Sequence, residues 1–178
     1  MYFEVACRLV TVVTFAVSVG AKVRGPGAFA SFVTAIQTLP HPRYPSPRLL
    51  GGAVVGGESL IVVLVLMPWT SEAGLLLSAL TLLTYLALTA LVLRRHMAVA
   101  CNCFGVSGQP IGVPSLVRNA GLFIVAVIGL ALAVDTANPP PGTRLLGTAT
   151  AAYGAVVIAT IAVYGDDLVW IATKSVRR

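Results

Sequence analysis

Two cysteines separated by one residue form the first pattern in this sequence that could carry out chemistry. Residues 101–105 read Cys-Asn-Cys-Phe-Gly. Thiols at this spacing can form a small, easily reduced disulfide ring, which suits thiol–disulfide exchange better than structural bracing. Zinc binding with His96 is the main chemical alternative, but a closed zinc site needs four ligands. We therefore expect Cys101 and Cys103 to form a redox pair, with no metal and no cofactor.

The second candidate is Glu58, an acid inside an apolar run. It lies nine residues after Leu49, which is roughly 13 Å along a helix and close to the midplane of a membrane. A carboxylate at that depth must be protonated, paired with a base or in contact with water, so it is a functional candidate. Arg118 is the most reachable partner, and Arg8 is the second choice. A structural ion pair and a direct chemical role both stay open.

Composition requires a membrane around these residues. Of 178 residues, 57% are hydrophobic and 10% are charged, and the mean hydropathy is +0.92. Soluble domains are about 25% charged, so a water-soluble core is excluded. The net charge of +6 comes mostly from residues beside apolar runs, which indicates membrane orientation and argues against nucleic acid as a partner.

Five apolar runs are close to the length that crosses a bilayer: 5–21, 49–67, 73–93, 113–134 and 145–164. The segment 26–40 is bounded by prolines and too short to cross, so we expect an interfacial or re-entrant helix there. The sequence thus predicts an all-α integral membrane protein. Its single transmembrane domain would cover 1–178 as a bundle of four to five transmembrane helices with one short interfacial or re-entrant helix.

Smaller patterns predict how the helices meet. Glu4 and Arg8 have the spacing of a helical ion pair. Gly52 and Gly56 predict a face for close helix packing. The third run carries a polar stripe for which we expect hydrogen bonds to neighbouring helices, formed by Ser78, Thr81, Tyr85 and Thr89.

The distribution of basic residues predicts the orientation. With five crossings, nine of them gather on one side, which the positive-inside rule makes cytoplasmic. The cysteine pair follows Arg94-Arg95 and would lie at or near that face. The nine are Lys22, Arg24, Arg43, Arg48, Arg94, Arg95, Lys174, Arg177 and Arg178.

Several of these motifs together resemble the MauE family, the methylamine utilisation membrane proteins related to the DoxX-like proteins. The resemblance covers about residues 20–119. Its specific part is the Cys-x-Cys-Phe-Gly element with Phe104 and Gly105, followed by Arg118-Asn119. Asn102 stands where the family usually has glycine, and Ala21-Lys22 stands where it has Ser-Lys.

The resemblance implies a redox-associated protein of the bacterial inner membrane. It would assist disulfide formation or maturation of an exported client, the methylamine dehydrogenase small subunit in the namesake role, beside a thioredoxin-like partner. Cys101, Cys103 and Glu58 would then carry the chemistry. Structural or binding roles would fall to Lys22, Phe104, Gly105, Arg118 and Asn119.

A non-redox alternative stays open. In it, the protein is a small membrane transporter or assembly module whose polar site is formed by Glu58 and Arg118. The sequence contains no nucleotide-binding loop, nucleophilic triad or haem attachment motif, so no classical enzyme class is indicated.

Overall fold

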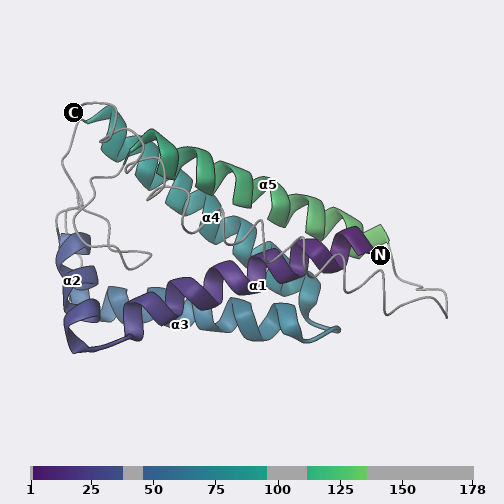
Figure 1. Ribbon diagram of the computed structural model, residues 1–178, viewed down its shortest axis with the longest axis horizontal. Helices are drawn as coiled ribbons and strands as arrows, with labels where there is room; N and C mark the ends of the chain where they lie inside the picture. Colours follow the sequence, from purple (N-terminus) through teal and green to yellow (C-terminus); the bar gives the residue numbers. More distant parts are fainter. Residues whose placement is uncertain (1, 38–45, 96–111, 136–178) are drawn as a thin grey trace, which may run out of the picture.

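The computed structural model describes residues 2–37, 46–95 and 112–135. Apart from short turns, this part of the chain is helical and contains no strand (Figure 1), which confirms the predicted all-α class. The expected last run, 145–164, lies outside the described residues, and the extent of the domain stays a prediction. The helices are α1 (Tyr2–Val23), α2 (Pro26–Gln37), α3 (Pro47–Leu66), α4 (Ser71–Arg94) and α5 (Val113–Asp135).

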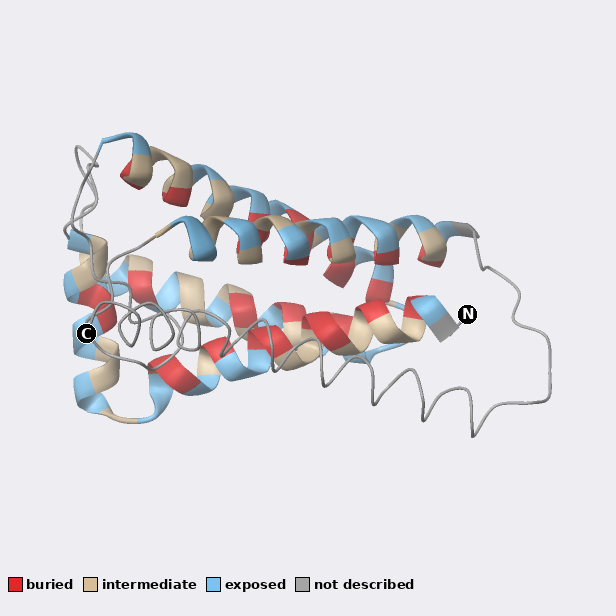
Figure 2. Ribbon diagram, turned by 45° about the horizontal axis from the view of Figure 1, so that its top comes forward, coloured by how far each residue is buried: buried red, intermediate tan, exposed pale blue. Residues whose placement is uncertain are grey.

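Four of these helices are long and apolar enough to cross a membrane, namely α1, α3, α4 and α5. Their outward faces carry large apolar side chains that would be unfavourable in water, such as Leu60, Leu80 and Ile124, each about half exposed. Burial follows the inner side of each helix (Figure 2). A lipid bilayer is the solvent that fits this surface, so the chain is a multi-pass membrane protein.

Helix α2 does not run along the bundle. Its 12 residues would be about 18 Å long, too short for a hydrocarbon core of about 30 Å. It lies crosswise at the end where α1 ends and α3 begins (Figure 1). Phe32 and Val33 are its buried residues, and Val33 packs closely on Gly51 of α3. The predicted short helix that does not cross is therefore confirmed.

Residue-level signals explain where α3 begins and ends. Pro47 is its first residue, where a missing backbone N–H costs nothing, and Ser46 before it is extended. After Leu66 the chain turns directly into α4. The Thr70 hydroxyl stabilises this turn by donating to the Leu64 carbonyl at 2.9 Å, so α3 and α4 are antiparallel neighbours.

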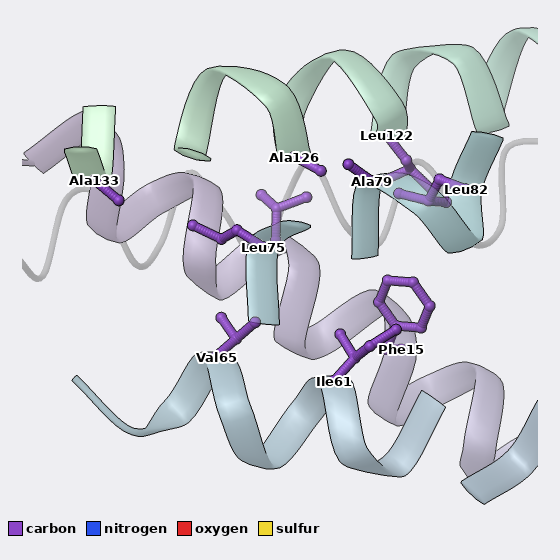
Figure 3. Packing of buried hydrophobic residues seen from close by; sticks show 10 residues of the cluster. Phe15, Ile61, Val65, Leu75, Ala79, Leu82, Leu122, Ala126 and Ala133 are labelled. Atoms are coloured by element: carbon purple, nitrogen blue, oxygen red, sulfur yellow. The ribbon is translucent and has the colours of Figure 1, made fainter. Parts of the chain in front are cut away.

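The spanning helices form two pairs, α1 beside α3 and α4 beside α5, and the core lies between the pairs (Figures 1 and 3). All four helices contribute buried side chains to it, including Phe15, Ile61, Leu75 and Ala126. Among these helices, α5 contacts α1 and α4 but not α3. This arrangement decides which polar residues can meet.

Within residues 2–37, 46–95 and 112–135, the predicted glycine face makes no close helix contact. A Cβ atom added to Gly52 or Gly56 would meet no described atom within 4 Å, because α3 turns these residues away from the other described helices. Close approaches occur at other glycines. A Cβ at Gly74 would lie 2.7 Å from the Val65 backbone nitrogen, and one at Gly129 would lie 2.9 Å from the Cβ of Cys7.

Candidate functional site

A buried ion pair joins Lys22 of α1 to Glu58 of α3. The Lys22 Nζ atom donates to both carboxylate oxygens at 2.6 Å, and each side chain is 1% exposed. The prediction that Arg118 is the partner of Glu58 is therefore wrong, and so is the second choice, Arg8. Arg118 is on α5, which does not contact α3 among the described helices, whereas α1 packs directly on α3.

Two hydroxyl groups complete the environment of the carboxylate. Ser18 donates to both oxygens of Glu58 at 3.2 and 3.3 Å, and it accepts a hydrogen bond from Lys22 at 2.7 Å. The Tyr85 hydroxyl of α4 donates to Oε1 at 2.6 Å. A buried carboxylate is stable only when its lone pairs are satisfied in this way. Glu58 thus connects three spanning helices at one point.

The crosswise helix α2 covers the ammonium group. The Lys22 Nζ atom lies 5.1 Å from the centre of the Phe32 ring, and Phe32 is buried. A cation at this distance from an aromatic face is attracted to the ring. Helix α2 therefore contributes to the site although it does not cross the membrane.

Asn119 extends the polar group towards α5. Its Nδ2 atom donates to the Thr89 hydroxyl at 3.5 Å, a long hydrogen bond, and Thr89 donates to the Tyr85 carbonyl at 2.8 Å. Of the two neighbouring residues in the motif, Asn119 is buried and Arg118 is only partly buried. The two spanning pairs thus both supply polar residues to the interior.

A small cavity lies between the two helix pairs beside the carboxylate. Its volume suffices for about one water molecule. It is lined by Thr14, Phe15, Ser18, Glu58, Leu82, Tyr85, Asn119 and Leu122.

The predicted polar stripe on α4 is confirmed in part. Tyr85 and Thr89 make hydrogen bonds with neighbouring helices, whereas Ser78 and Thr81 bond to carbonyl groups of α4 itself. Sequence reasoning did not assign a role to Ser18. Its signal was the four-residue spacing to Lys22, which places both side chains on one face of α1.

The predicted redox pair, Cys101 and Cys103, and the predicted structural or binding residues Phe104 and Gly105 lie outside the described residues. The chain leaves the described part after Arg95 and re-enters it at residue 112, and α4 ends and α5 begins at the same end of the bundle (Figure 1). Within 2–37, 46–95 and 112–135, no three His, Cys, Asp or Glu side chains gather as a metal site.

A second ion pair lies on the first turns of α1. Glu4 and Arg8 form it, which confirms the predicted helical pair. Arg8 is partly exposed, unlike the ion pair at Glu58. Cys7, the third thiol, is buried beside Gly129 of α5.

The fold and the buried polar site define a small helical membrane protein in which the buried Lys22–Glu58 ion pair joins two spanning helices. The sequence model described as methylamine utilisation protein MauE matches residues 1–132, so the chain belongs to the MauE family. The matched range contains every candidate site residue. No curated protein and no solved structure matches the chain.

Proposed function

We propose that this MauE-family protein takes part in thiol–disulfide exchange in the bacterial inner membrane. Its role would be to assist disulfide formation or maturation of an exported client, together with a thioredoxin-like partner. The observation that carries the proposal is the Cys101-Asn102-Cys103 motif, which falls within the region matched to the family. Methylamine utilisation, from which the family takes its name, gives the setting in which we test it.

The proposed chemistry is a two-electron exchange. A disulfide between Cys101 and Cys103 accepts two electrons and two protons from a client dithiol, and the client disulfide forms. A disulfide of the thioredoxin-like partner then oxidises the cysteine pair again and becomes a dithiol. Over one turn the client loses two electrons and two protons and the partner disulfide gains them, so the thioredoxin-like partner is the oxidant and one partner disulfide is consumed per client disulfide formed.

In this proposal the ion pair of Glu58 is an anchor. Its carboxylate accepts hydrogen bonds from Lys22, Ser18 and Tyr85, and these contacts fix α1, α3 and α4 relative to one another. Helix α4 leads directly into the segment with the cysteines. Fixing α4 would therefore fix the point from which that segment starts.

Replacing both cysteines tests whether they are needed. A methylamine-growing bacterium that lacks its own MauE gene would be complemented with this chain, with the double variant C101S/C103S, and with C7S. We expect the double variant to be present in the membrane at normal levels but to abolish growth on methylamine. C7S is the matched control, because Cys7 is a buried thiol of α1, and it should support growth. Growth with the double variant would refute the redox role and leave the transporter or assembly module as the better hypothesis.

A chemical measurement tests the exchange itself. Purified protein would be equilibrated in glutathione buffers of defined potential, and mass spectrometry would count free thiols at positions 101 and 103. We expect the pair to change between dithiol and disulfide within the accessible range. A dithiol that persists at every potential, or one bound zinc ion per chain, would contradict the proposal.

A further inference from the structure

The end of the bundle that α2 covers carries exposed positive charge. Four arginines lie there, and none of them forms an ion pair with another described residue. Two lie beside α2, one directly after α1 and one on the first turn of α3, and the other two end α4 (Figure 1). We call these four residues the basic end: Arg24, Arg48, Arg94 and Arg95.

The chain has few acids that could neutralise the basic end. It contains six, against twelve lysines and arginines. Two of the six form the ion pairs described above. Glu72 and Asp135 belong to the opposite end of the bundle, where α4 begins and α5 ends (Figure 1). Asp166 and Asp167 remain, and three further basic residues follow them in the sequence. Neutralising charge for the basic end therefore has to come from outside the chain.

The depth of the basic end in the membrane indicates what supplies that charge. Arg24 directly follows Val23, an exposed apolar residue. In the same way, Arg48 directly precedes the exposed Leu49. An exposed charge beside a lipid-facing apolar residue is typical of the border between hydrocarbon and headgroups. At the other end of α3, the exposed Trp69 fits the opposite interface. The 20 residues of α3 between these borders span about 30 Å, the thickness of a hydrocarbon core.

We propose that the basic end binds the phosphate groups of anionic phospholipids. Arginine suits this role because its planar guanidinium can donate two hydrogen bonds to one phosphate. Arg24 and Arg48 lie beside α2, which packs on both α1 and α3. Lipid bound to these two arginines holds the crosswise helix, and with it the Phe32 ring that covers Lys22.

Lipid competition tests this site. Purified protein would be offered equal amounts of phosphatidylglycerol, which is anionic, and phosphatidylcholine, which is not, and native mass spectrometry would count the bound lipids. We expect wild-type protein to retain mainly phosphatidylglycerol. A basic residue near an anionic surface strengthens binding about fivefold, so Arg24→Gln and Arg48→Gln should each lower this preference by up to about fivefold.

Arg8→Gln is the matched control, because it also removes one arginine but from the opposite end of the bundle (Figure 1). It should leave the preference nearly unchanged. Equal losses in Arg8→Gln and Arg48→Gln, or no loss in either variant of the basic end, would overturn the proposal. Displacement of the lipid by soluble glycerol phosphate would also overturn it, because the site would then bind a free anion.

A second measurement uses only wild-type protein. Hydrogen–deuterium exchange would be compared in nanodiscs of phosphatidylcholine with and without phosphatidylglycerol. We expect the anionic lipid to slow exchange in α2 but not in the turn 67–70 at the opposite end of α3. Equal slowing at the two ends, or none at α2, would refute the site. Neither test involves Cys101 or Cys103, so the result is independent of the proposed redox function.

Discussion

Removal of the Lys22 ammonium group should destabilise the bundle strongly. Lys22 and Glu58 are each 1% exposed, so neither charge can be screened by water when the other is lost. Breaking a buried pair by removing one partner costs about 3–5 kcal/mol. In Lys22→Met the carboxylate still accepts hydrogen bonds from Ser18 and Tyr85, which places the expected loss near the lower limit, at about 3 kcal/mol. For a chain of this size that corresponds to a fall of about 6–12 °C in melting temperature.

The double variant Lys22→Met/Glu58→Gln tests whether the two single losses come from breaking the ion pair or from a general loss of stability. Glu58→Gln alone leaves the ammonium group buried without its counter-charge, so we expect a loss similar to that of Lys22→Met. Together, the two changes leave no unpaired charge, and the amide oxygen introduced at position 58 can still accept a hydrogen bond from Tyr85. The double variant should therefore lose less than the sum of the single losses.

The assay is thermal unfolding of purified protein in one detergent, followed by intrinsic fluorescence. Glu4→Gln combined with Glu58→Gln is the additivity control. Glu4 lies on α1 about 21 Å from Ser18, the residue of that helix that contacts Glu58, so these two effects should add. Strict additivity of Lys22→Met and Glu58→Gln would refute the ion pair as the main support of the site.

Three further predictions use other contacts. Tyr85→Phe removes the hydroxyl that donates to the buried carboxylate, and it should cost about 1.5–3 kcal/mol in thermal unfolding. Gly74→Ala places a Cβ 2.7 Å from the backbone of α3 and should lower the melting temperature, whereas Gly56→Ala meets no neighbour in the described part of the chain and should not. An equal effect at the two glycines would contradict the packing of α3 on α4. The predicted cytoplasmic orientation leaves reduced Cys101 and Cys103 unmodified by a membrane-impermeant maleimide in intact cells, whereas direct exchange with an exported client requires the opposite face. Rapid labelling would therefore reverse the predicted orientation, and protection would exclude direct exchange with the exported client.

Much of the fold could be predicted from the sequence. Apolar runs of about 20 residues set the spanning helices, and the length of the segment after Pro26 already indicated a helix that does not cross. The motif around Cys101 and Cys103 indicated the family, which the match over residues 1–132 confirms. Span lengths and motifs depend only on the order of residues along the chain, so they can be predicted without knowing which helices pack against each other.

The site was predicted less completely. The depth of Glu58 in an apolar run showed that it needs a partner, and this holds for any arrangement of helices. The choice of partner followed depth along the predicted spans, and it selected Arg118, one turn into the fourth span from the same side. The helix that carries Arg118 does not contact α3, whereas the last turn of α1 brings Lys22 to within 2.6 Å.

The sequence by itself therefore determined the membrane class of the protein, the apolar runs and the need to neutralise an acid within them. Only the tertiary structure decided that Lys22 is the partner, that Phe32 covers it, and that Gly74 rather than Gly56 marks a close contact among the described helices. The reason is physical. Lipid is as apolar as the interior of the bundle, so hydropathy reports depth in the membrane but not which side of a helix faces its neighbours. The rotation of each helix about its own axis depends on how several helices pack together.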